Sequence, residues 1–144
     1  MKIKVSAIAT YNSLLRDRIN DFLKMKLKEV GADDLVPSYG SLLYVVYTHG
    51  GRVQISVLYN TLLKQKTTIT EMINRLVKLG YLKKEKCAED RRVTYVIATE
   101  KAMDIKKKFD NISEDLLNKL YDGFTEGEKS EFVRLMQKAI KNFS

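Results

Sequence analysis

Apolar side chains recur at helical spacing along most of this chain, beginning with residues 6–31. The run ends at Gly31, a residue type that commonly follows the last turn of a helix. Its apolar positions are Ile8, Tyr11, Leu15, Ile19, Phe22, Leu23, Leu27 and Val30. A helix of this length is about 40 Å long, more than the core of a small domain covers. We therefore expect it either to pack against a second subunit or to lie along the surface of its own domain.

Two shorter helices and a short strand are predicted next. Pro37 suits the first turn of a helix. Residues 38–49 are apolar around much of the helical circumference, which indicates a buried helix that ends at a glycine pair. Residues 52–55 are a candidate minor strand beside a later hairpin, and a third helix is predicted over residues 57–64. Its expected N-cap is Ser56, and its expected inward-facing side chains are Leu58 and Leu62.

The stretch from Lys66 to Ile97 predicts a helix, a stop at Gly80 and two strands joined by a charged turn. One face of the helix is apolar at i, i+3, i+4, i+7 spacing, which predicts packing on a core. These positions are Ile69, Met72, Ile73 and Leu76, and the alternating positions of the return strand are Val93, Tyr95 and Ile97. Thr68 and Glu71 have the spacing of a capping box, so Glu71 either caps the helix or faces a partner.

The opposite face of this helix is polar, and the turn between the strands is rich in arginine. The side chains concerned are Lys66, Thr67, Thr68, Thr70, Glu71, Asn74, Arg75 and Lys78 on the helix, with Asp90, Arg91 and Arg92 at the turn. A polar helix can enter the major groove of DNA while an arginine-tipped ribbon reaches the flanking minor groove. These are therefore the candidate DNA-binding residues.

Two further helices close the chain. Thr99-Glu100-Lys101 opens a long helix predicted over residues 101–121, and residues 122–124 break it. Thr125 and Glu128 form a second capping-box pattern at the start of the last helix. The apolar positions of the two helices are Met103, Ile105, Phe109, Ile112, Leu116, Leu117 and Leu120, then Phe132, Leu135, Met136, Ile140 and Phe143. No linker or repeat is visible, so residues 1–144 are predicted to form a single domain.

The formal net charge is +8, which suits a polyanionic partner. Between Lys66 and Arg92, eight lysine and arginine side chains stand against four carboxylates. A lysine-rich composition alone would produce some of this excess, and a charged run is commonly no more than a solvated face. The charge therefore supports the DNA-binding interpretation but is not sufficient evidence for it by itself.

Cysteine and histidine usage argues against several kinds of chemistry. One cysteine cannot form an internal disulfide, and one cysteine with one histidine, His49, cannot build a common structural zinc site. No catalytic triad pattern and no glycine-rich phosphate loop is present, so we expect neither an enzyme nor a cofactor. No apolar run approaches the ~20 residues that span a bilayer, and no signal-peptide core is evident. A cytoplasmic protein without membrane contact is the expectation.

Several motifs together resemble the MarR family of transcriptional regulators. They are Arg75-Leu76, Gly80, Asp90-Arg91-Arg92 and Thr99-Glu100-Lys101-Ala102, which are similar to the end of the family's recognition helix, its wing and its next helix. The order of elements also resembles the family over nearly the whole chain. The resemblance implies a mainly α fold with a small β-hairpin wing. A winged helix-turn-helix over residues 37–99 would lie between dimerisation helices over residues 6–31 and 101–144.

The resemblance also implies a function. Family members are homodimeric regulators of double-stranded DNA, so we expect a repressor that binds a pseudo-palindromic operator and responds to a small-molecule effector of unknown identity. By this likeness Thr67, Thr68, Thr70, Glu71 and Asn74 lie where the recognition helix faces bases and phosphates. Arg92 lies where the wing arginine enters the minor groove, and Asp90 lies where an aspartate orients that arginine.

The chain departs from the family pattern at three places. Leu63 stands where a glycine is frequent, Glu71 replaces a frequent arginine, and Cys87-Ala88 replaces a common Asp-Pro. Cys87 is interpreted as an ordinary cysteine rather than an oxidant sensor. A rival hypothesis is a winged-helix protein–protein interaction module without sequence-specific DNA binding. It predicts a hydrophobic or acidic exposed face on the helix that begins at Lys66.

Overall fold

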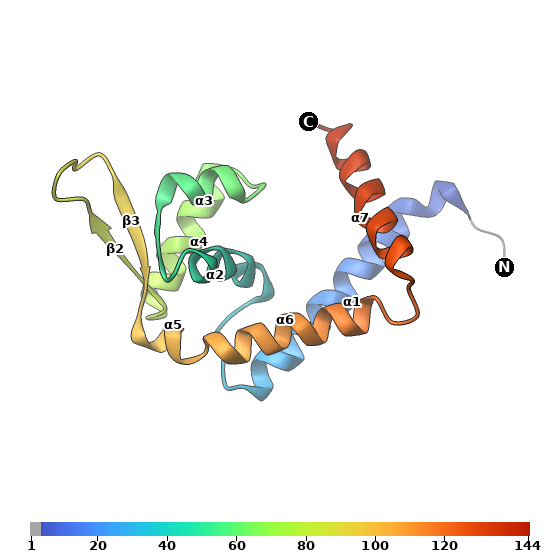
Figure 1. Ribbon diagram of the computed structural model, residues 1–144, viewed down its shortest axis with the longest axis horizontal. Helices are drawn as coiled ribbons and strands as arrows, with labels where there is room; N and C mark the ends of the chain where they lie inside the picture. The colour runs from blue at the N-terminus through green and yellow to red at the C-terminus, as the bar shows by residue number, and fades with distance from the viewer. Residues whose placement is uncertain (1–3) are drawn as a thin grey trace. The chain divides into compact units, whose positions relative to one another are not determined.

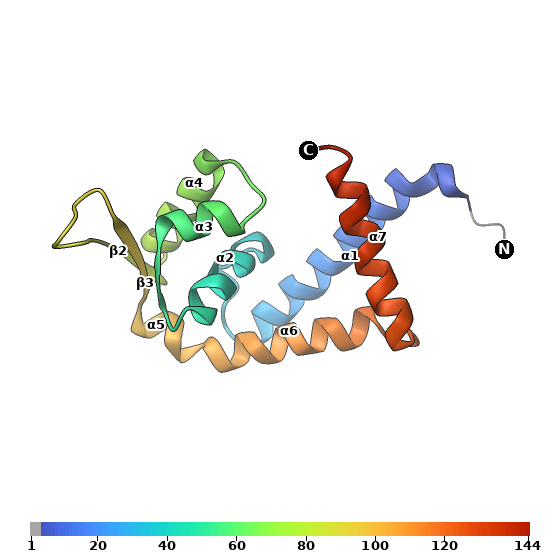
Figure 2. The same ribbon diagram turned by 45° about the horizontal axis from the view of Figure 1, so that its top comes forward.

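The computed structural model describes residues 4–144, which form helices and one small antiparallel sheet (Figure 1, Figure 2). They fall into two compact units with the boundary between Ile112 and Ser113. The first unit contains η1 (Val5–Ala7), α1 (Ile8–Glu29), α2 (Pro37–Thr48), β1 (Arg52–Gln54), α3 (Ile55–Thr61), α4 (Lys66–Lys78), β2 (Leu82–Lys86), β3 (Thr94–Ala98), α5 (Glu100–Asp104) and the start of α6 (Lys106–Leu120). The second contains the end of α6 and α7 (Glu126–Lys141). The predicted mainly α fold is confirmed, and the single domain stays a prediction.

The sheet has the strand order β1-β3-β2, and both pairings are antiparallel. The predicted minor strand is therefore present, with Val53 of β1 opposite Val96 of β3. Val96 is fully buried, whereas its neighbours Tyr95 and Ile97 are only partly buried. The face of β3 that packs on the core is thus the one that carries Val96. In Figure 1 the β2–β3 hairpin extends away from α2, α3 and α4 as a two-stranded wing.

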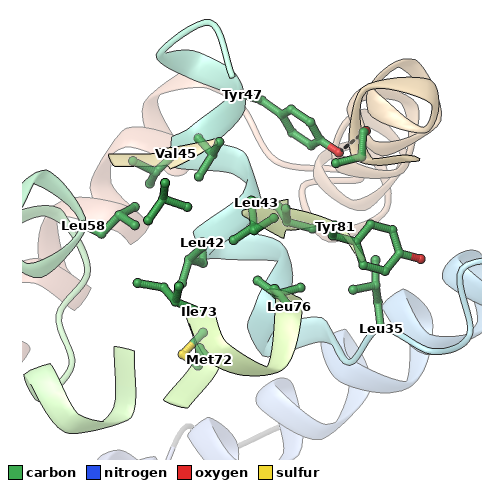
Figure 3. Close-up of a cluster of buried hydrophobic side chains, with 14 of the residues drawn as sticks. Leu35, Leu42, Leu43, Val45, Tyr47, Leu58, Met72, Ile73, Leu76 and Tyr81 are labelled. Atoms are coloured by element: carbon green, nitrogen blue, oxygen red, sulfur yellow. Dashed lines mark hydrogen bonds between the residues drawn. The ribbon is translucent and has the colours of Figure 1, made fainter. Parts of the chain in front are cut away.

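Helices α2, α3 and α4 share their core with the base of the sheet (Figure 3). Within the described chain, the apolar residues with no exposed surface are Leu42, Leu43, Val46, Leu58, Ile69, Ile73, Leu76, Val96 and Ala102. Burying one aliphatic side chain of this size stabilises a fold by roughly 1.5–3 kcal/mol. The apolar stripe predicted for α4 is confirmed, because Met72 joins Ile69, Ile73 and Leu76 in the core. Burial of this stripe fixes which face of α4 points outward.

The third helix differs from its prediction over residues 57–64. Helix α3 begins at Ile55, directly after β1, and ends at Thr61. Its N-cap is Gln54, which makes no side-chain capping bond, so the Ser56 cap was wrong. The cause is the pairing of Gln54 with Tyr95, since it holds Gln54 in extended backbone up to the first helical residue. Leu58 is fully buried as predicted, and Leu62 is partly buried just beyond the helix.

The long helix predicted over residues 101–121 is also wrong, because α5 and α6 are separate helices with Ile105 between them. Near this break the Tyr47 hydroxyl donates to the carbonyl oxygen of Ala102 at 2.5 Å (Figure 3). An unbroken helix would offer this oxygen to the amide of Lys106. Burial and the nearby Asp110 carboxylate raise the pKa of Tyr47 to about 12, which keeps the hydroxyl a donor.

The end of α4 and the base of the wing are held by a polar cluster around Asp34. The Tyr81 hydroxyl donates to one Asp34 carboxylate oxygen at 2.7 Å, and Lys101 Nζ donates to the other at 3.3 Å. Lys101 also donates to the carbonyl oxygen of Leu79, the C-cap of α4, at 2.8 Å. Burial alone would raise the pKa of Asp34, but these hydrogen bonds outweigh it and lower that pKa. The cluster thus connects the α1–α2 loop to both ends of the hairpin.

The second unit is organised around its turn. Phe124 makes edge-to-face contacts with Tyr121 and Phe132, at centroid distances of 5.4 and 5.8 Å. The predicted capping box is confirmed, since Glu128 N donates to Thr125 Oγ1 and Thr125 N donates to Glu128 Oε1. No side chain of α7 is buried within the described chain. The exposed apolar residues of this unit are Leu117, Val133, Leu135, Met136, Ile140 and Phe143.

Candidate nucleic-acid interface

The outward face of α4 is polar along its whole length. Opposite the buried stripe, at i, i+4, i+7, i+11 spacing, lie Thr67, Glu71, Asn74 and Lys78. The remaining predicted residues flank this line and are Lys66, Thr68, Thr70 and Arg75. All eight side chains are exposed except that of Thr70, which is half-buried. The structure therefore brings the predicted helix residues together on one solvent-facing surface.

The start of α4 excludes helix capping, one of the two roles considered for Glu71. The N-cap is Gln65, which makes no side-chain capping bond, and Thr68 lies inside the first helical turn. The Thr68–Glu71 capping box is therefore wrong, because a capping box requires its threonine just outside the helix. The first turn also carries no acidic residue, so its free backbone N–H groups face solvent without a local carboxylate. Glu71 consequently has no capping role.

The end of α4 agrees with the prediction and sets where the wing begins. Gly80 adopts a positive φ of 88°, the left-handed conformation that glycine takes most easily. The amide of Tyr81 then donates to the carbonyl oxygen of Leu76 at 2.9 Å, closing the last turn of the helix. Strand β2 starts at Leu82, so the helix and the wing are separated by three residues. This short connection fixes the wing beside α4.

Two of the predicted residues are held by neighbouring elements. The hydroxyl groups of Thr70 and Tyr59 form a hydrogen bond of 2.9 Å between α4 and α3. Lys84 Nζ on β2 donates to Asn74 Oδ1 at 2.5 Å, which ties the wing strand to the outward face of α4. Thr70 therefore belongs partly to the packing between helices, whereas Asn74 is exposed and oriented by the wing.

The wing turn presents Arg92 in a defined geometry. Asp90 accepts three hydrogen bonds from Arg92. Its Oδ1 accepts from the backbone N and from the side-chain Nε of Arg92, at 3.0 Å each, and its Oδ2 accepts from Nη2 at 3.2 Å. The hydrogen bonds from Arg92 lower the pKa of Asp90, so the carboxylate is ionised at neutral pH. The Arg92 side chain nevertheless remains 91% exposed, and Arg91 beside it is exposed too. A directed but solvent-facing guanidinium is suited to entering a narrow groove.

Sequence reasoning missed two cations near the wing, Lys84 and Arg52. Lys84 follows Leu82 by two residues in β2, so strand alternation places both on the α4 side, and this signal was available. Arg52 lies on β1, and its guanidinium carbon is 3.6 Å from the centroid of the Tyr95 ring on β3. That contact depends on the β1–β3 register, which the sequence does not give. Lys84 thus extends the basic surface beside α4, whereas Arg52 lies opposite Ile97, on the other face of the sheet from Lys84.

Cys87 lies directly after β2, at the start of the wing turn. The Cys87 thiol is half-buried and donates to Glu89 Oε2 at 3.1 Å in the wing turn. Within residues 4–144, no group of three or more His, Cys, Asp or Glu side chains is placed to hold a metal ion. Over the same residues, no helix is both long and apolar enough to span a membrane.

Comparison with known proteins agrees with this geometry. Residues 39–102 match a family model described as a winged helix DNA-binding domain. No curated protein has a matching sequence. A MarR protein from Peptoclostridium difficile is similar in structure, with a TM-score of 0.78, 26% identity and coverage of 99% of this chain and 92% of that chain.

Two further solved structures share the fold. The organohalide-sensing transcriptional regulator RdhR, in its 2,4-dichlorophenol-bound form, has a TM-score of 0.81 at 18% identity, covering 98% of this chain and 82% of that chain. A mutant of E. coli MarR complexed with operator DNA has a TM-score of 0.77 at 18% identity, covering 94% of both chains. The winged-helix match and these likenesses show that residues 39–102 form a winged helix DNA-binding domain and that the chain has the fold of the solved MarR proteins.

Proposed function

We propose that this regulator is a homodimeric repressor that binds a pseudo-palindromic operator through α4 and the wing. Two copies of α4 enter successive major grooves about 34 Å apart, one in each half-site. The observation that carries the proposal is the exposed polar face of α4, together with a wing turn in which Asp90 holds an exposed Arg92. The E. coli MarR relative was solved with operator DNA, which supports the same use of this fold.

The wing supplies the contact to the flanking minor groove. Arg92 inserts where A·T-rich sequence narrows the groove and strengthens its negative potential. Because Asp90 already restricts the guanidinium, less side-chain freedom is lost on binding. The exposed Lys86, on the same face of β2 as Lys84, is suited to a phosphate contact that helps to set the register of the complex.

Exposed apolar side chains on the terminal helices support the homodimer. On α1 and the turn before it, Val5, Ile8, Tyr11 and Leu14 are 48–82% exposed. Within the described chain, Leu27 is the one buried side chain of α1. Four apolar residues of α7 are exposed as well, Val133, Leu135, Met136 and Ile140. A second copy of the chain would cover such surfaces, which monomeric proteins seldom leave in water.

Introducing charge on α1 should separate the dimer. We expect Ile8→Glu with Tyr11→Glu to give a monomer in sedimentation velocity, because two carboxylates would have to be buried without partners. Helical circular dichroism should stay unchanged, since both side chains are at least half exposed in one chain. Arg16→Glu, an exposed substitution on the side of the helix away from Tyr11 and Leu14, makes the same change of net charge, and this control should remain dimeric. A double variant that sediments like the unmodified protein would exclude α1 from the interface.

A small-molecule effector is part of the proposal. RdhR was solved with 2,4-dichlorophenol and a MepR-like protein with pseudoligands, so ligand binding occurs in this fold. An effector would lower operator affinity by favouring a spacing of the two α4 helices that does not match the half-sites. Screening small aromatic compounds for loss of operator binding tests this directly.

The rival function, a protein–protein interaction module, fits the surface less well. It predicts a hydrophobic or acidic outward face on α4, whereas that face carries threonine, asparagine, lysine and arginine with a single glutamate. Hydroxyl-radical footprinting on fragments of the protein's own promoter region separates the two functions. We expect two protected regions about one helical turn apart. Uniform protection, or none, would favour the rival.

A further inference from the structure

Glu71 occupies the centre of the outward face of α4 and has no structural role there. It lies in the second helical turn, on the same line as Thr67 and Asn74, opposite the buried stripe. The side chain is exposed, and within the described chain it makes no hydrogen bond and no ion pair. Residues in the first turns of a recognition helix are those that reach base edges. Glu71 is therefore placed to face bases rather than the phosphates that flank the groove.

The chemistry of a carboxylate restricts which base it can contact. An ionised glutamate only accepts hydrogen bonds. In the major groove guanine presents two acceptors and thymine one acceptor beside its methyl group, so neither offers a donor. Adenine offers its N6 amino group next to the N7 acceptor, which repels a carboxylate. Cytosine offers its N4 amino group without an adjacent acceptor on the same base. Cytosine is thus the base that Glu71 fits best.

Asn74, one helical turn further on, is restricted in a complementary way. Lysine can only donate, so the Asn74 atom bonded to Lys84 Nζ is the carbonyl oxygen. The two-bond contact of asparagine with adenine needs that oxygen as the acceptor from N6. Lys84 occupies one of the two lone pairs of that oxygen, whereas the amide N–H groups, for which the described chain supplies no partner, can donate to guanine or thymine acceptors. The middle of α4 therefore presents an acceptor at Glu71 followed by a donor at Asn74.

We propose that Glu71 determines specificity by accepting a hydrogen bond from the N4 amino group of one cytosine in each half-site. The inference rests on the proposed operator binding and adds the base that this position selects. It also explains how a carboxylate is tolerated in a DNA-facing helix. At the centre of the face it meets a donor, whereas on either flank it would meet phosphate.

The test compares Glu71→Gln with the unmodified protein on duplexes that carry each base pair in turn at every operator position. The unmodified protein should lose roughly tenfold in affinity when the selected cytosine becomes any other base. The Glu71→Gln variant should shift its preference at that position to adenine, which glutamine contacts through two bonds. Glu85→Gln on β2 makes the same change of charge at an exposed site and should keep the cytosine preference.

Two outcomes overturn the inference and are distinguishable. If the unmodified protein discriminates among duplexes but Glu71→Gln has the same base profile, Glu71 does not read a base. The same holds if the variant binds every duplex more tightly by one common factor, since that is the effect of charge alone. If the unmodified protein binds all duplexes equally, the proposed operator binding fails, and the cytosine contact fails with it.

Discussion

Replacing Asp90 with asparagine should weaken binding to operators with A·T-rich flanks, although the change removes a negative charge from the turn that we propose to face DNA. Two effects oppose each other here. Removing one exposed carboxylate relieves a repulsion that water and salt reduce to less than about 1 kcal/mol. Asparagine has one acceptor oxygen in place of two, so it cannot hold Nε and Nη2 of Arg92 together as Asp90 does; this loosens the guanidinium, and a good groove contact is worth roughly 1–3 kcal/mol. The loss of orientation should therefore dominate.

Arg92→Ala should weaken the same complexes further, by about tenfold or more. Arg91→Ala is the matched control, since it removes the same charge from the adjacent exposed position. It should lower the affinity for all DNA sequences by the same factor and reduce the slope of log affinity against log salt concentration by about 1. Fluorescence anisotropy with A·T-rich and G·C-rich flanks measures all three variants. An increase in affinity for Asp90→Asn on every flank would show that Asp90 acts only through its charge.

Leu76→Ala should have the largest effect on stability. Leu76 has no exposed surface and lies where α4 packs on the core beneath the wing. Truncating a buried leucine typically costs about 2–5 kcal/mol, from lost burial and the cavity left behind. That is a large part of the 5–15 kcal/mol by which most domains are stable. Urea unfolding followed by circular dichroism measures the change.

Val77→Ala provides the control for Leu76→Ala. Val77 is the next residue of α4 and is 37% exposed, so its truncation should cost less than about 1 kcal/mol. Both changes are in the same helix, and alanine favours the helix in each. Equal destabilisation by the two variants would contradict the orientation of α4, and with it the face assigned to DNA.

Local patterns were enough to predict the parts of the site that depend on local structure. The stripe from Ile69 to Leu76 follows from helical period, and the stop at Gly80 follows from its freedom to adopt positive φ. The Asp90–Arg92 pair was expected from the resemblance, and it forms because the two residues lie within one turn. Whether these groups contact DNA remains a prediction.

Other features depend on contacts between distant residues, which periodicity does not contain. The break at Ile105 coincides with a bond from Tyr47, 55 residues before Ala102. The start of α3 is set by strand pairing of Gln54 with β3 rather than by the capping preference of Ser56. The bond from Lys84 to Asn74 requires β2 to return beside α4, so the structure was needed to identify which atom of Asn74 is free.

The central claim is that this chain binds DNA sequence-specifically through α4 and the wing. The most direct measurement is the affinity for the footprinted operator and for a scrambled duplex of equal length, each titrated with salt. We predict that affinity for both falls as salt rises, while the operator stays at least about 1,000-fold tighter at physiological salt. Equal affinities for the two duplexes across the titration would contradict the claim.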